Sequence, residues 1–234
     1  MKQYTVSGCI VTHNNMKTIK ATLESLFFNT KGVDFKLFIV DNSSTDGTVD
    51  FIRKNFCNEN IEIIETGTNY GFGAGHNVVL DKLHSKYHVI INPDIILTSD
   101  VLAVMTEYLD NNEDIGLLSP RICFPDGREQ ILGKRNPKLK YLIASRFRNE
   151  TSPGRTLRKY AMLDQDLTKP IDIENATGCF MMIKTELFKA ICGFDENYFM
   201  YFEDCDLTRT VKKQARTVYY PQAVISHVWG RESK

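Results

Sequence analysis

Acidic and aromatic side chains are concentrated in the segment 193–206, which carries five residues of each kind. If Leu207 and Val211 lie on the buried face of a helix, helical spacing places Glu203 and Asp204 at the N-terminal edge of that face. A carboxylate beside aromatic surface is partly desolvated, which raises its pKa and suits it to act as a general base. The helix dipole also favours acids in a first turn, but it accounts for one carboxylate and not for the aromatic setting.

Two further carboxylates follow apolar runs that are typical of strands. Asp41 comes directly after Phe38-Ile39-Val40, and a carboxylate there can accept the imino N–H of uracil or thymine, or the N1–H of guanine. Asp94 ends the sequence Asn92-Pro93-Asp94, where its oxygens would suit Mg²⁺ or Mn²⁺ beside a diphosphate. For both residues a helix cap is the alternative.

The glycine-rich segment 69–77 invites comparison with the dinucleotide fingerprint G-x-G-x-x-G. A motif that began at Gly71 would need glycine at position 76, which is His76. Small residues that open a helix still let a ligand approach the backbone near its positive end. The alternative is a structural turn.

Strands and helices alternate through the first half of the chain, which predicts βαβ units. The fold class we expect is therefore α/β, with a Rossmann-like, mostly parallel central sheet and helices on both faces. Ligands bind at the carboxyl ends of the strands in such sheets, and four polar clusters follow the predicted strands. The strands are predicted at 4–12, 35–40, 61–65 and 87–91, the helices at 16–28, 45–56, before 83 and from 99, and the clusters at 12–14, 41–44, 67–69 and 92–94.

The second half is less regular. Its pattern predicts a strand broken by a turn at 120–127, a strand at 177–183, a helix at 203–214 and short strands near Val218 and Val224. We treat 1–234 as one domain, with a nucleotide-sugar-binding half at 1–98 and an acceptor and catalytic half at 99–234. Residues 134–160 look like a mobile excursion from it.

That excursion is strongly basic, with nine Lys or Arg residues between Lys134 and Lys159 against one acid, Glu150. Apolar residues at 139, 141–143 and 147 alternate with these charges and could form one side of a short helix. A solvated loop is the alternative. We expect instead that the run contacts an anionic acceptor, a lipid-linked pyrophosphate glycan at an anionic membrane surface. The basic residues are 134, 135, 138, 140, 146, 148, 155, 158 and 159.

Composition excludes several classes of protein. Lys plus Arg and Asp plus Glu are both 29, so no global charge favours nucleic acid. The six cysteines include no C-x-x-C pair, which argues against structural zinc and a disulfide framework and fits a reducing cytoplasm. No apolar run reaches the roughly 18 residues of a membrane span, and no signal peptide is visible. We expect a cytoplasmic protein that at most sits peripherally on the membrane.

Taken in order, these motifs resemble inverting glycosyltransferase family 2, which has the GT-A fold. The resemblance runs from about Val6 to Gly230. Asn92 stands in place of the first acid of the family's D-x-D motif, as in its rhamnosyltransferase-like branch. The segments that carry the likeness are Val11–Asn14, Phe38–Thr48, Asn69–Asn77, Ile91–Asp94, Tyr201–Asp204 and His227, with Arg158–Asp164 and Gly178–Met181 similar to transferases that use dTDP-L-rhamnose.

The resemblance implies a role for each matching residue. Asp204 would be the catalytic base with Glu203 beside it, and Asp94 with His227 would hold Mg²⁺ or Mn²⁺. Without the resemblance, a lone histidine such as His227 is more often structural. The acceptor-binding residues would be Gly178, Cys179, Tyr201 and Arg158. The donor-binding residues would be Thr12, His13, Asn14, Asp41, Ser43, Asp46, Asn69, Gly71, Gly73, Asn77 and Asn92.

The implied reaction is a single displacement from a nucleotide-diphosphate sugar, with dTDP-L-rhamnose as the first choice, to a hydroxyl of a glycan or lipid-linked glycan. Two other classes stay open. A sugar nucleotidyltransferase would carry a glycine-rich loop with Arg and Lys after its first strand, and Val11–Met16 has none. A non-catalytic module that binds sugar nucleotides would bind the donor without releasing nucleoside diphosphate.

Overall fold

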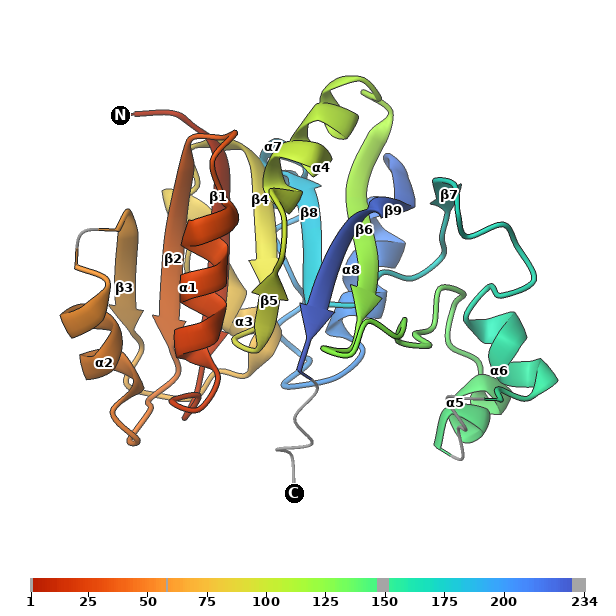
Figure 1. The fold of residues 1–234 in the computed structure, drawn as a ribbon, viewed down its shortest axis with the longest axis horizontal. Coiled ribbons are helices and arrows are strands. Elements are labelled where there is room, and N and C mark those ends of the chain that lie inside the picture. Colours follow the sequence, from red (N-terminus) through yellow and green to blue (C-terminus); the bar gives the residue numbers. More distant parts are fainter. Residues whose placement is uncertain (1, 58, 147–151, 229–234) are drawn as a thin grey trace.

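The computed structural model describes residues 2–57, 59–146 and 152–228, and its centre is one nine-stranded sheet. The strand order is β3-β2-β1-β4-β8-β6-β9-β5, and β7 pairs with β9 (Figure 1). The strands are β1 (Tyr4–Thr12), β2 (Phe35–Asp41), β3 (Ile61–Glu65), β4 (Ser85–Ile91), β5 (Ile95–Leu97), β6 (Ile115–Cys123), β7 (Ile171–Asp172), β8 (Phe180–Lys184) and β9 (Arg216–His227).

Helices cover both faces of the sheet, as predicted (Figure 1). One core lies under α1, α2 and α4, where Ile19, Ile52 and Met105 pack against the strands. The other lies under α7 and α8, where Phe188, Leu207 and Val211 are buried. The helices are α1 (Ile19–Asn29), α2 (Thr48–Asn55), α3 (Phe72–Asn77), α4 (Val101–Asp110), α5 (Leu139–Arg146), α6 (Arg155–Tyr160), α7 (Thr185–Ala190) and α8 (Glu203–Val211), with a 3-10 turn η1 (Leu80–Lys82).

The sheet is parallel through the first half of the chain and mixed in the second. The pairs β1/β2, β1/β4 and β2/β3 are parallel, as predicted. In the second half only β6/β9 is parallel, whereas β8 runs antiparallel between β4 and β6. The β5 strand, from the predicted first half, pairs with β9 from the second, so one sheet runs through both halves.

Two element boundaries predicted in the second half are wrong. The strand predicted at 120–127 begins at Ile115, because its buried part is the run Ile115–Leu118 and the chain turns after Cys123. The short strands predicted near 218 and 224 are one strand, β9. An irregularity in its pairing with β6, where the partner shifts from Tyr220 to Val224, separates the two apolar stretches.

The basic excursion forms two short helices where the structure describes it, and α5 agrees with the short helix that its apolar residues suggested. Tyr141 of α5 stacks on Tyr160 of α6, with ring centroids 5.0 Å apart, and Leu157 completes a small separate core. Arg135 then ties the excursion down by donating two hydrogen bonds of 2.9 Å to Asp164. Phe147, Arg148 and Glu150, which belong to the predicted basic segment, lie outside the described residues.

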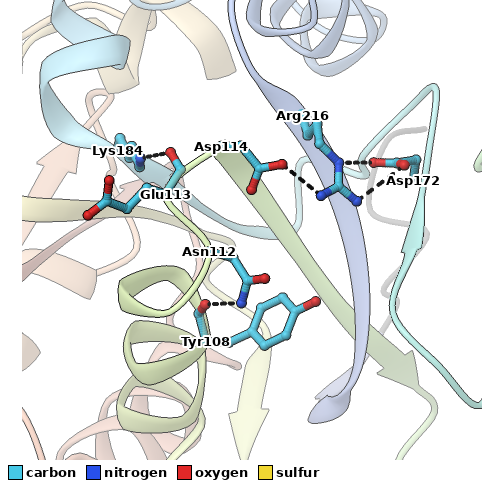
Figure 2. A network of polar contacts seen from close by, with 7 residues as sticks. All are labelled: Tyr108, Asn112, Glu113, Asp114, Asp172, Lys184 and Arg216. Carbon is cyan, nitrogen blue, oxygen red and sulfur yellow. Dashed lines mark hydrogen bonds and ion pairs between the residues drawn. The ribbon is translucent and has the colours of Figure 1, made fainter.

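A charged network fastens the amino ends of β6 and β9 (Figure 2). Arg216 at the start of β9 donates to Asp172 of β7 at 2.9 and 3.2 Å, and to Asp114, which precedes β6, at 2.9 Å. These ion pairs are half-exposed to water. In the part of the chain that the structure describes, none of the helices has the length and apolar composition needed to cross a bilayer.

Candidate active site

Loops from both halves of the chain meet at the carboxyl edge of the sheet. Thr12 and Asp41 are the last paired residues of β1 and β2. Across β4 and β8, Ile91 pairs with Phe180, and the backbone N–H of Asn92 donates to the carbonyl of Cys179 at 2.8 Å. The polar clusters predicted at these strand ends therefore lie along one edge.

Asp41 is placed to receive a donor from a ligand. Its side chain is 3% exposed, and Oδ2 accepts the backbone N–H of Ser44 at 3.0 Å. Oδ1 is buried and has no hydrogen-bond partner. A buried carboxylate oxygen without a partner is costly, so this atom is suited to accept the imino N–H of a bound base.

The loops around Asp41 are held by their own side chains. His13 and Asn14 bridge to the facing loop, through Nδ1 to the carbonyl of Asn42 at 2.7 Å and through Oδ1 to the N–H of Thr45 at 2.8 Å. The Thr12 hydroxyl donates to Asn15 at 3.0 Å. Asn14 and Ser43 have φ of 58° and 64°, and the left-handed region is uncommon for residues other than glycine.

Three residues predicted to bind the donor make hydrogen bonds within the protein. Asp46 accepts the N–H groups of Met16 and Thr48 at 2.9 and 3.0 Å, which orders the start of α2. Although its burial raises the pKa, these hydrogen bonds hold the pKa of Asp46 below its usual value. Asn69 accepts the N–H of Gly71 at 2.9 Å. The amide of Asn77 donates to the carbonyl of Phe194 at 2.8 Å and accepts its N–H at 2.9 Å. All three side chains therefore help to position the loops.

The glycines of the segment 69–77 are required by packing. Gly71 has φ of 82°, and a Cβ there would lie 2.1 Å from the carbonyl oxygen of Phe199. A Cβ on Gly73 would lie 2.9 Å from Cβ of Phe194. The glycines thus let α3 approach the acidic and aromatic segment 193–206 closely. This favours the structural alternative for these residues, and it explains how the two segments meet.

Asp94 and His227 form the candidate metal site. Asp94 Oδ1 lies 3.2 Å from Nε2 of His227 without hydrogen-bond alignment, and the backbone N–H of Val228 donates to the carbonyl of Asp94 at 3.0 Å. Gln130 holds His227 in place, because its amide nitrogen donates to the backbone carbonyl of His227 at 2.9 Å and its Oε1 lies 3.4 Å from Nδ1 of the imidazole. Burial lowers the pKa of His227, but the neighbouring Asp94 and Cys179 outweigh burial and raise it to about 10.

Asp94 and His227 suit a divalent ion that takes most of its ligands from a bound substrate and from water. No group of three or more His, Cys, Asp or Glu side chains that could hold a metal occurs among the described residues. Mg²⁺ and Mn²⁺ bind through one or two protein ligands together with phosphate oxygens and water. Asp94 Oδ1 and His227 Nε2 lie together as an ion pair, and a divalent ion held by both atoms would displace the proton that His227 carries there. Asn92 directly follows β4 and lies two residues before Asp94 in the sequence.

Glu203 and Asp204 open α8, and both are largely withdrawn from water. Glu203 is 6% exposed, its Oε2 has no hydrogen-bond partner, and burial raises its pKa to about 7. Asp204 Oδ2 accepts the N–H of Gly178 at 3.0 Å, and Oδ1 accepts that of Cys205 at 2.8 Å. Burial raises the pKa of Asp204 in spite of these bonds. Burial thus makes both carboxyl groups stronger proton acceptors than exposed ones, and the pKa of Glu203 lies near neutral pH.

The residues predicted to bind the acceptor do not all lie together. Gly178 contacts Asp204 directly, since a Cβ on it would lie 3.2 Å from Cβ of Asp204. Cys179 is 4% exposed, and its thiol lies beside His227. Tyr201 is exposed in the loop that precedes α8. Arg158 is exposed on α6, within the excursion.

A groove beside α8 adds residues that the sequence reading missed. It has a volume of about 640 Å³ and runs between the start of the excursion and one face of α8. Spacings of three, four and seven residues from Phe202 place its lining on one helical face, a signal that could have been read from the sequence. The lining residues are Asn136, Pro137, Tyr198, Phe202, Cys205, Asp206 and Arg209.

Tyr160 was also missed, although it lies between the excursion and Asp204. Burial, together with nearby Cys205 and Asp204, raises the pKa of its phenol to about 12. Its carbonyl accepts the N–H groups of Lys134 and Arg135 at 3.1 Å. One edge of the sheet thus carries three candidate groups. They are the Asp41 carboxylate near the ends of β1 and β2, the Asp94–His227 pair, and the Glu203–Asp204 pair.

Known proteins share this sequence pattern. The family profile described as "Glycosyl transferase family 2" matches residues 7–192, so Glu203, Asp204 and His227 lie beyond the matched region. The N-acetylglucosaminyl-diphospho-decaprenol L-rhamnosyltransferase of Mycobacterium tuberculosis is 26% identical over 82% of this chain, which spans 66% of that protein's length. The rhamnosyltransferase WbbL of Escherichia coli is 25% identical over 92% of this chain and 79% of its own.

A solved structure supports the fold. The mannosyltransferase PcManGT of Pyrobaculum calidifontis, in complex with GDP-Man and Mn²⁺, superposes on the whole chain with a TM-score of 0.67 at 16% identity, over 59% of its own length. The fold is therefore that of GT-A enzymes. Since the family profile covers most of the sequence, the chain belongs to glycosyl transferase family 2.

Proposed function

We propose that this chain transfers a sugar, with inversion, from a nucleotide-diphosphate donor to a hydroxyl of a glycan or lipid-linked glycan in the synthesis of a cell-surface polysaccharide. The first choice of donor is dTDP-L-rhamnose, because two of the similar proteins are named rhamnosyltransferases. The observation that carries the proposal is the placement of Asp204 and Glu203, both with raised pKa values, on the edge of the sheet that also holds Asp41 and Asp94.

Asp204 is the base in this mechanism. The acceptor hydroxyl gives its proton to Asp204 as its oxygen bonds to the anomeric carbon, and the bond from that carbon to the diphosphate oxygen breaks. One displacement inverts the anomeric centre and needs no covalent intermediate. The N–H of Gly178 orients the carboxyl through its 3.0 Å hydrogen bond. A base positioned in this way contributes about 10² to 10⁴ in rate.

The donor lies with its base at Asp41 and its diphosphate near Asp94. The unpartnered Oδ1 of Asp41 accepts the imino N–H of thymine or uracil. Asp94 and His227 would hold the divalent ion, Mg²⁺ or Mn²⁺. When bound, such an ion neutralises charge on the departing diphosphate. The Mn²⁺ in the PcManGT structure, which has the same fold, supports the use of a divalent ion.

The first experiment is a panel of nucleotide sugars read by thermal shift, with Mn²⁺ and with a chelator. We expect the largest Mn²⁺-dependent shift with dTDP-L-rhamnose, and a shift of about the same size for the Asp204→Asn variant, which keeps the donor site. If no nucleotide sugar stabilises the protein, the proposed function is wrong.

A non-catalytic module is the second candidate, and hydrolysis separates the two. An enzyme slowly releases nucleoside diphosphate from its donor when water replaces the acceptor, whereas a binding module does not. Release of dTDP by the parent and its loss in Asp204→Asn would support the enzyme. Binding without release from either protein would favour the module.

A further inference from the structure

The surface beside the candidate acceptor groove combines exposed apolar side chains with exposed basic ones. On α5, Leu139 is 75% exposed and Ile143 is 53% exposed. They lie four residues apart, and thus on one face of the helix. The opposite side of α5 faces the protein, because Tyr141 is buried against Tyr160. Exposed large apolar residues grouped in this way mark an interaction site.

The described residues of α5 and those just before it carry positive charge only. Lys138, Lys140 and Arg146 are exposed and flank the apolar pair, and the segment 137–146 contains no acid. Two residues of the basic run at 134–159 do not contribute to the surface around α5. Lys134 is buried beside Glu129, and Arg135 is engaged with Asp164. The usable positive charge is therefore concentrated on the excursion's helices.

A second apolar group precedes α8 and includes Phe202, which lines the other wall of the groove. Phe199, Met200, Tyr201 and Phe202 are consecutive, and each is between 44% and 61% exposed. Both Tyr201 and Phe202 have φ of 72°, which is strained for aromatic residues. Such strain persists where the surrounding structure requires it, and it is concentrated at functional sites.

The groove joins the two groups. Asn136 and Pro137, just before α5, line one side of it, and Tyr198 and Phe202 line the other. Its wall on α8 includes Cys205, the residue after the base Asp204. In Figure 1, α5 lies at the same end of the molecule as the carboxyl ends of β6 and β9. The apolar groups thus flank the passage by which an acceptor reaches the base.

We infer that α5 and the segment 199–202 dock on an anionic lipid bilayer, and that the groove between them receives an acceptor head group from that surface. Apolar side chains of this kind insert at the boundary of head groups and acyl chains, and basic side chains beside them pair with anionic lipid. The inference rests on the proposed function for the identity of the acceptor, but not for the lipid contact itself.

Flotation with vesicles tests the contact. The probes are vesicles of phosphatidylcholine alone and of phosphatidylcholine with phosphatidylglycerol, at low and high salt. We expect the parent to float with the anionic vesicles at low salt. The triple variant Lys138→Gln, Lys140→Gln, Arg146→Gln should partition about a hundredfold more weakly there, from roughly fivefold per basic residue. This loss should shrink at high salt, because salt screens exposed charges.

The apolar contribution has its own variant and a matched control. Leu139→Ser with Ile143→Ser should lower partitioning several-fold at both salt concentrations, since insertion of apolar side chains is not screened. Phe28→Ser with Lys31→Gln is the control, because Phe28 is 76% exposed beside Lys31 at the end of α1. The control should float like the parent.

Three outcomes would overturn the inference: no flotation of the parent, equal loss in the control, or a parent dimer in lipid-free solution that Leu139→Ser with Ile143→Ser dissociates. The last would make the surface an interface between copies of the chain. Donor hydrolysis in lipid-free buffer is measured on the same proteins. Its absence from the parent would refute the proposed function, whereas its persistence in variants that no longer float would show that only the lipid contact was removed.

Discussion

Carboxylates at the two edges of the sheet differ in their exposure to water and in their hydrogen-bond partners. At the amino edge, Asp114 and Asp172 lie in water and share the guanidinium of Arg216 (Figure 2). At the carboxyl edge, Asp41 and Glu203 are buried, and each has one oxygen without a hydrogen-bond partner. The first arrangement fastens strands at little cost. The second costs stability, because a buried carboxylate loses its hydration without full compensation.

The backbone follows the same division. Four of the six described non-glycine residues with positive φ, Asn14, Ser43, Tyr201 and Phe202, lie in loops at the carboxyl edge, whereas Met162 follows α6 and Cys192 follows α7. Such conformations cost about 1–3 kcal/mol each and persist where the surrounding structure imposes them. The comparison teaches that strain and unsatisfied carboxylates occur together at the edge that we propose for catalysis, whereas the satisfied pairs at the other edge are structural.

The largest effect should come from Asp204→Asn. The amide keeps the shape of the side chain but cannot take a proton, so transfer should fall by about 10² to 10⁴ while donor affinity stays within a few-fold. Steady-state kcat and donor Kd measure the two quantities. Asp195→Asn, at an exposed acid of the same segment, should leave kcat nearly unchanged. A larger loss of kcat in Glu203→Gln than in Asp204→Asn would move the base to Glu203.

Glu203→Gln should change how the free energy of unfolding depends on pH. Burial raises the pKa of Glu203 from 4.5 to about 7, so the folded protein holds this proton over a range in which the unfolded chain releases it. The ionising carboxyl therefore destabilises the fold progressively as pH rises from about 4.5 to 7. The variant removes this penalty, which amounts to at most about 3 kcal/mol above pH 7. Denaturant unfolding should show the variant gaining stability relative to the parent between pH 4 and pH 8, and a constant difference would contradict the assignment.

Asp94→Ala should weaken Mn²⁺-dependent binding of the nucleoside diphosphate. Loss of a residue that only hydrogen-bonds a metal ligand lowers metal affinity about 10- to 100-fold. Loss of the ligand Asp94 itself should lower the Mn²⁺-dependent affinity by at least as much. Calorimetry with and without Mn²⁺ measures it. Asp81→Ala changes an exposed acid in η1 and should bind like the parent. Undiminished Mn²⁺ dependence in Asp94→Ala would exclude Asp94 as a ligand.

The smallest effect should come from the amino edge. Asp172→Asn removes one partner of Arg216, whose side chain is 48% exposed and keeps Asp114. Exposed ion pairs contribute about 0.2–1 kcal/mol, so the free energy of unfolding should fall by less than about 1 kcal/mol and kcat should not change. A drop in kcat comparable to that of Asp94→Ala would erase the distinction between the two edges.

The sequence by itself determined the parallel βαβ half and the positions of its polar loops, because alternating apolar runs and turn residues are local signals. It also indicated Glu203 and Asp204, since acids among aromatic residues predict desolvation. The antiparallel insertion of β8 and the true extent of β6 and β9 were not readable, because strand order and pairing depend on distant partners.

Only the tertiary structure decided which polar side chains stay available. Asp46, Asn69 and Asn77 look as suitable for a donor as Asp41 does, yet their hydrogen bonds are made within the protein. Gly71 and Gly73 look like a ligand loop, but close packing against the segment 193–206 requires them. A side chain's type fixes what it can bind, whereas its neighbours in space fix whether that capacity is already used.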